Sequence, residues 1–314
     1  MNMKTLLLIC LALIIFPVGV TNAAGRSTID GHATDDTETA GRNAVVSLGH
    51  CSGTLITDLI VLTAAHCVPV GLRVARPDDN TTVHCSKLWD QHKLQARAWE
   101  DPMVWHPIPP RKTLSIAFGV DRARQRMPIK VRAYSIPRCA DIALLQLVRR
   151  ASKALVTPMK VLTKPSLGTT DFDALLLEAR LYYAGWGLGK KSPKQLPNRQ
   201  TGRVSYWDRN ACLLFTLPPE RSGGERIVGG DSGSPLIMRH RGTDLVVGVL
   251  FGRGLPDSDT CGRPLLPPPQ RHGAYTPTFR GAIPGTEATD LAAWLAHFAP
   301  EAIYPPRATN SEPD

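Results

Sequence analysis

Two kinds of feature are missing from most of this sequence. Beyond residue 23, no apolar run approaches the roughly 18 to 20 residues needed to cross a bilayer, so we expect no stable membrane anchor. The chain also has no Cys-x-x-Cys and no His-x-x-x-His pair, the spacings typical of zinc ligands, and His84, Cys85 and His92 do not supply such a set. We therefore predict no metal ion and no cofactor.

Positive charge is abundant but dispersed. The formal net charge is +10, and a basic surface of this kind attracts membranes, nucleic acids or anionic glycans when its charges are gathered. Here Lys and Arg cluster only at 122–126 and 190–194. The scatter favours an ordinary solvated surface, and we predict no nucleic-acid partner.

The N-terminal 23 residues have the pattern of a secretory signal peptide. Lys4 precedes an uncharged, largely apolar run from Leu6 to Val20, and small residues follow near Ala23. An uncleaved anchor is the alternative, but the run is short for a membrane span. We predict a signal peptide at 1–23 and a secreted or periplasmic protein.

The cysteines fit that destination. Of the seven cysteines, Cys10 leaves with the signal peptide and six remain. An even number in a chain bound for an oxidising compartment predicts disulfides. The six are Cys51, Cys67, Cys85, Cys139, Cys212 and Cys261.

The pattern of the chain favours an all-β fold. Short β-rich runs alternate with Gly and Pro, and two packed barrels suit the length. The expected strands are 44–48, 53–63, 114–120, 129–134, 142–148, 181–187 and 245–251.

One helix is expected near the C-terminus. Leu291, Trp294 and Phe298 share a face at helical spacing. We predict that Thr286 or Thr289 caps this helix and that the Pro-rich, polar residues 300–314 form a flexible tail.

Three short segments carry the chemistry. His66 lies in Thr-Ala-Ala-His-Cys, Asp141 begins Asp-Ile-Ala-Leu-Leu, and Ser232 lies in Gly-Asp-Ser-Gly-Ser-Pro. A serine hydroxyl becomes a useful nucleophile when an imidazole accepts its proton and a carboxylate fixes that imidazole's tautomer. The sequence thus predicts a His-Asp-Ser catalytic triad.

These segments resemble the trypsin-like (chymotrypsin-fold) serine proteases, in the order that family has. The α/β-hydrolases use the opposite order and a Gly-x-Ser-x-Gly turn, whereas Pro235 and the apolar residues after Ser232 here favour a strand. The resemblance covers 29–299. It implies two six-stranded antiparallel β-barrels packed together with a C-terminal α-helix, and hydrolysis of polypeptide substrates.

The resemblance also implies individual roles. His66 would act as general base and Asp141 as its orienting carboxylate, with Ser232 as nucleophile. The backbone N–H groups of Gly230 and Ser232 would form the oxyanion hole. A disulfide between Cys51 and Cys67 is implied as well. Pairing of the remaining four cysteines stays open, with Cys85–Cys139 and Cys212–Cys261 as guesses.

Activation is expected by analogy with the family's zymogens. Asp231 would pair with a new N-terminal amine, so the unprocessed chain should be nearly inactive until an activating protease removes a short propeptide at 24–28. Cleavage after Arg26 would expose Ser27, whereas cleavage after Thr28 would expose Ile29, which suits the family's apolar pocket better. The sequence leaves both sites open.

Substrate contacts are expected from five positions. Leu250, Phe251 and Gly252 would pair with an extended substrate as an added strand. Arg226 takes the place of the carboxylate at the floor of the trypsin pocket, and Gly252 and Gly273 would keep its walls open. A guanidinium there predicts an acidic or other non-basic P1 preference. The alternative is that Arg226 points to solvent.

One region departs from the family. His66 and Asp141 are further apart than usual, and we assign the surplus to a surface insertion at 68–112. It is either a binding loop or, more simply, a lid packed on its own tryptophans.

The sequence as a whole predicts a secreted serine endopeptidase. The alternative is a catalytically silent, protease-like binding protein, and an unrelated esterase is a third class.

Overall fold

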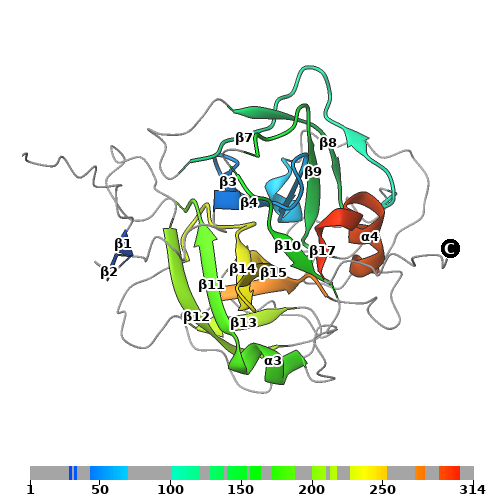
Figure 1. The fold of residues 1–314 in the computed structure, drawn as a ribbon. Helices are drawn as coiled ribbons and strands as arrows, with labels where there is room; N and C mark the ends of the chain where they lie inside the picture. Colours follow the sequence, from blue (N-terminus) through cyan, green and yellow to red (C-terminus); the bar gives the residue numbers. More distant parts are fainter. Residues whose placement is uncertain are drawn as a thin grey trace, which may run out of the picture.

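The computed structural model shows two β-sheet bodies packed together, with few helices (Figure 1). It describes residues 28–29, 32–33, 43–69, 101–119, 128–137, 140–153, 156–163, 172–187, 200–209, 213–217, 227–252, 273–279 and 290–304. Several predictions lie outside these residues, namely the signal peptide, most of the insertion, Arg226, Cys85, Cys139, Cys212 and Cys261.

The first body is built from strands of the N-terminal half. Its strands are β3 (Val45–Ser47), β4 (Ser52–Leu55), β5 (Ile60–Thr63), β6 (His106–Pro107), β7 (Ser115–Ile116), β8 (Ile129–Ser135) and β9 (Ala143–Leu147). They pair antiparallel in the order β3-β4-β5-β9-β8-β6, with β7 also on β8. Ser47 and Ala117 exchange two backbone hydrogen bonds of 2.9 Å, so β7 runs back to β3 and the sheet closes on itself.

The second body is a closed barrel of six antiparallel strands. They are β11 (Arg180–Gly185), β12 (Gln200–Arg209), β13 (Leu214–Leu217), β14 (Pro235–His240), β15 (Thr243–Gly252) and β16 (Gly273–Pro277). The order β14-β11-β12-β13-β16-β15 returns to β14 through the β14–β15 pairing. The prediction of two β-barrels with a C-terminal helix is confirmed.

Two short strands outside the barrels depart from antiparallel pairing. Strand β10 (Lys160–Leu162) lies parallel to both β15 and β17 (Ile303–Tyr304). With the 3₁₀ turn η5 (Pro300–Ala302), β17 makes the first part of the predicted tail an ordered segment. The prediction of a tail beginning at residue 300 was therefore wrong, because β17 pairs with the edge of β10.

The C-terminal helix α4 spans Leu291–Phe298, and Asp290 caps it by accepting hydrogen bonds from the N–H groups of Ala292 and Ala293. The prediction of a threonine cap was wrong, since the carboxylate directly before the helix reaches these donors first. Trp294 is fully buried and donates from its indole to Ser135 on β8, at 3.0 Å. The helix thus packs on the first barrel.

Two other expectations change. The run 53–63 is a hairpin of β4 and β5, because the Thr57 hydroxyl accepts hydrogen bonds from Leu59 and Ile60 and turns the chain. The end of the predicted insertion belongs to the fold: β6 pairs with β8, and the Trp105 ring packs at a tilt of 59° against Phe298 of α4, with ring centroids 4.6 Å apart. A short helix, α3 (Phe172–Glu178), was not foreseen.

Candidate active site

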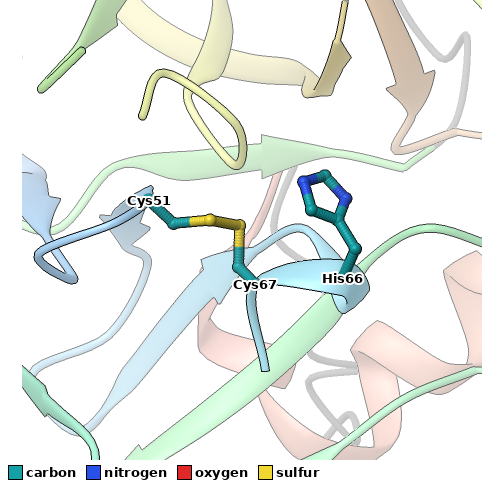
Figure 2. A group of neighbouring side chains, drawn as sticks. All are labelled: Cys51, His66 and Cys67. Carbon is teal, nitrogen blue, oxygen red and sulfur yellow. A yellow bond between two sulfur atoms is a disulfide. The ribbon is translucent and has the colours of Figure 1, made fainter. Parts of the chain in front are cut away.

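His66 lies on the 3₁₀ turn η2 (Ala65–Cys67) that directly follows β5. A disulfide joins Cys67 of this turn to Cys51 before β4, with Cα atoms 5.9 Å apart, and the imidazole stands beside it (Figure 2). A ring nitrogen of His66 lies within 4.8 Å of both sulfur atoms. Because these sulfurs are bonded to each other, the group offers no thiolate to a metal ion.

Asp141 meets His66 through the pairing of β5 with β9. Thr63 lies opposite Ala143 in this antiparallel pair, so the residues just beyond Thr63 and just before Ala143 emerge at the same end. The fully buried Asp141 carboxylate accepts from the His66 backbone N–H at 2.8 Å, and its other oxygen lies 2.6 Å from Nδ1 of the ring. The two contacts fix both the backbone and the imidazole.

This contact sets the proton affinity of the ring. Burial acts to lower the pKa of His66, but the charge of Asp141 and its hydrogen bond raise the pKa, and the net shift is upward from 6.5. With Nδ1 turned to the carboxylate, the proton of the neutral ring sits there. Nε2 is then the nitrogen that can accept a proton from a substrate or a hydroxyl.

Ser232 comes from the other barrel, on the loop that leads into β14. Its carbonyl oxygen accepts from the Ser52 N–H at 2.8 Å and lies 3.5 Å from Sγ of Cys67, the neighbour of His66 in sequence. The serine residue is half-buried. The structure therefore brings the Ser232 loop against the turn that carries His66.

Glycines make this close approach feasible. Gly230 and Gly233 have φ values of 96° and 84°, which favour glycine. A Cβ on Gly233 would lie 2.2 Å from the Ser52 carbonyl oxygen and 2.3 Å from Oγ1 of Thr63, so no side chain fits. Among the described residues, no hydrogen bond is formed by the N–H of Gly230 or of Ser232.

The Asp231 side chain lies against the second barrel, next to Gly185 at the end of β11. It is fully buried and accepts from the N–H groups of Gly187 at 2.7 Å and Val228 at 2.9 Å. A Cβ on Gly185 would lie 2.3 Å from its Oδ1. Ile29, one of the two candidate new termini, lies in strand β1 (Thr28–Ile29), which pairs with β2 (His32–Ala33), and the other, Ser27, lies outside the described residues.

Four of the five predicted substrate residues lie on β15 and β16, namely Leu250, Phe251, Gly252 and Gly273, whereas Arg226 is outside the described residues. Leu250 exchanges hydrogen bonds with the loop after Ser232, and the Phe251 ring lies edge-on to His66 with centroids 6.2 Å apart. A Cβ on Gly252 would have none of the described residues within 4 Å.

Gly273 is crowded instead. Its Cβ would lie 2.5 Å from Cδ1 of Ile227, 2.8 Å from the Tyr275 ring and 3.0 Å from the Thr216 hydroxyl. Sequence reasoning missed Ile227, although it directly follows Arg226.

Ser52 was also missed. This fully buried residue accepts at Oγ from the Trp186 N–H, at 2.8 Å, and donates to the Gly230 carbonyl, at 3.0 Å. Its only sequence signal is its place directly after Cys51.

Comparison with known proteins agrees with this arrangement. The family model described as Trypsin matches residues 29–265. The chain is 26% identical over 211 residues to coagulation factor IX of Oryctolagus cuniculus, covering 64% of this chain and 65% of that protein. It is 27% identical over 276 residues to granzyme A of Bos taurus, covering 82% and 87% respectively. Within the described residues, no helix has the length and apolar character to cross a bilayer. The chain belongs to the family of trypsin-like serine proteases.

Proposed function

We propose that this chain is a secreted serine endopeptidase that hydrolyses peptide bonds through an acyl-enzyme, with His66, Asp141 and Ser232 as its catalytic triad. One observation carries the proposal: His66 is anchored twice to the buried Asp141 carboxylate, through its backbone N–H at 2.8 Å and through Nδ1 of its ring at 2.6 Å, on a turn that touches the Ser232 loop. Family membership supports the same reaction type and polypeptide substrates.

The roles follow from which atoms are already engaged. Asp141 holds Nδ1, so Nε2 of His66 takes the proton as Ser232 Oγ attacks the substrate carbonyl. The same nitrogen then gives that proton to the departing amine, which leaves an ester on Ser232. A water molecule attacks the ester and loses a proton to Nε2, and Nε2 returns that proton to Ser232 Oγ as the acid product leaves.

The N–H groups of Gly230 and Ser232 are proposed to stabilise the negative oxygen of the tetrahedral intermediates. Their support is that, among the described residues, neither donor is engaged elsewhere. A donor of this kind contributes about 3 to 4 kcal/mol to the transition state.

We extend the proposal to a non-basic, including acidic, P1 side chain. Among the described residues, the three atoms nearest to a Cβ built on Gly273 belong to Ile227, Tyr275 and Thr216, and none of these side chains has a carboxylate to bind Lys or Arg. Leu250, Phe251 and Gly252 would hold the substrate backbone. The acidic preference additionally depends on Arg226, and efficient cleavage after Arg in a peptide library would end it.

The proposal also includes secretion of the chain and its activation by cleavage near the N-terminus. Asp231 is already buried within the loop that carries Ser232, and its carboxylate is the proposed partner of a new N-terminal amine. Ile29 would have to leave its pairing with His32 to reach it. N-terminal sequencing of active material checks both steps, because full activity of a chain that still begins at residue 24 would rule the activation out.

The deciding experiment is labelling with a fluorophosphonate after treatment with activating proteases. Wild-type protein should be labelled, and Ser232→Ala should not. Ser234→Ala is the matched control, since it removes a buried hydroxyl two residues away and should leave labelling intact. Failure of every processed form to label would favour the silent binding protein instead.

A further inference from the structure

Ser52 holds the loop that carries the nucleophile, although it belongs to the opposite barrel. Its backbone N–H donates to the carbonyl of Ser232, at 2.8 Å, and its hydroxyl donates to the carbonyl of Gly230, at 3.0 Å. The two acceptors bracket Asp231. One residue of β4 therefore fixes the peptide planes that follow both Gly230 and Ser232.

The hydroxyl is fully committed. Besides donating to Gly230, it accepts from the N–H of Trp186, at 2.8 Å, on the segment after β11. A serine hydroxyl has one proton to donate, and the Ser52 hydroxyl donates it to the Gly230 carbonyl. Because the side chain is fully buried, no water replaces it easily, and its loss would leave a carbonyl and an N–H without partners.

The loop that carries Gly230 and Ser232 needs a hydrogen bond from outside to hold one conformation. Gly230 has a φ of 96°, and glycine has little conformational preference of its own, so contacts from outside must select one orientation. The N–H of Gly230 is one of the two donors proposed for the oxyanion hole. Rotation about Gly230 would misdirect that donor, and a donor displaced by a fraction of an ångström stabilises the transition state less.

We propose that Ser52 is a positioning residue for the oxyanion hole, acting through the Gly230 carbonyl; this inference rests on the proposed function. Its hydroxyl would affect the step in which negative charge develops, and would leave ground-state substrate binding nearly unchanged. A residue that only joined the two barrels would lower stability without this distinction.

The test is Ser52→Ala in the processed enzyme, with Ser47→Ala as matched control. Ser47 lies directly opposite Ser52 on β3 and is also buried, but its hydroxyl accepts a hydrogen bond from the Gly49 N–H. We expect kcat to fall about tenfold in Ser52→Ala with KM within about twofold, and both constants to be kept in Ser47→Ala. Ser52→Gly removes the same hydroxyl and replaces Ser52→Ala if that variant does not fold.

A second readout separates positioning from stability. A peptide aldehyde that forms a tetrahedral adduct with Ser232 should bind Ser52→Ala about tenfold more weakly, whereas the carboxamide of the same peptide should bind equally well. Equal weakening of both ligands, or unchanged kcat in an active enzyme, would overturn the inference while the proposed function stands. If the wild type proves inactive, a crystal structure of Ser52→Ala decides, because an unmoved Gly230 carbonyl refutes the positioning role.

Discussion

The two barrels supply the candidate site by different physical means. The first barrel supplies a pair of side chains, His66 and Asp141, and holds them by direct contact at 2.6 Å. The second supplies a loop whose use depends on backbone shape, with glycines at positive φ and N–H groups that no described residue engages. Substitutions in the first barrel should lower activity by removing a charge, and substitutions in the second should lower it by displacing the backbone of the loop.

Removing the charge in the first barrel is expected to have the largest effect. Asp141→Asn keeps the size of the side chain but no longer holds the imidazole in the required tautomer, so kcat should fall on the order of 10⁴-fold. Asp58→Asn is the control, because the Asp58 side chain pairs with the exposed Arg150, and its kcat should stay within about twofold. Steady-state kinetics on processed protein measure both, and equal losses in the two variants would contradict the assignment of Asp141.

Crowding the second barrel should act through backbone displacement. In Gly185→Ala the new methyl would lie 2.3 Å from both Oδ1 of Asp231 and Oγ of Ser234, so the catalytic loop must shift. We expect kcat to fall about 100-fold, with a lower melting temperature. Gly229→Ala, whose new methyl would have no described residue within 4 Å, should keep both values. A normal kcat in Gly185→Ala would show that the loop tolerates such a shift.

A smaller effect is expected at the proposed P1 pocket. Gly273→Ala places a methyl 2.5 Å from Cδ1 of Ile227, and should lower kcat/KM about tenfold for substrates with a large apolar P1 residue. Adding Ile227→Ala should recover much of the lost kcat/KM in the double variant, because it removes Cδ1 of Ile227, the atom that the new methyl would clash with. A double-mutant cycle measured with one peptide series tests this. Strict additivity would mean that Ile227 and Gly273 do not share a pocket.

The smallest expected effect is a shift in the pH dependence of kcat/KM. His66 must be neutral to accept a proton, and its pKa is raised above 6.5, so the acidic limb of kcat/KM should have its midpoint above 6.5. The favourable pairing of the charged ring with Asp141 stabilises the fold below the unfolded pKa and is lost as pH rises through the folded one. Asp141→Asn should move the midpoint downward, and an unmoved midpoint would assign the limb to another group.

Much of the site was readable because its chemistry lies in short segments. The flanking residues of His66, Asp141 and Ser232 predicted a triad, and the disulfide of Cys51 with Cys67 was inferred from the same resemblance. Turn chemistry was readable too, although it was overlooked at Thr57, where a hydroxyl accepting from two backbone N–H groups divides 53–63 into two strands. The helix cap failed for a similar reason, since the nearest carboxylate, Asp290, outcompeted more distant threonines.

Contacts between distant segments were not readable. Ser52 and Gly230 are 178 positions apart, and no periodicity links them. The same holds for the packing of Trp105 against Phe298, which makes part of an apparent insertion a component of the fold.

The sequence by itself determined the residue types able to perform acyl transfer, their order and the all-β character, because these depend on local composition and spacing. Only the tertiary structure decided that Ser52 ties the Gly230 loop to the first barrel and that Ile227 fills the space over Gly273. The physical reason is that a hydrogen bond or a steric contact depends on distances of a few ångströms, and these are set when the two barrels pack.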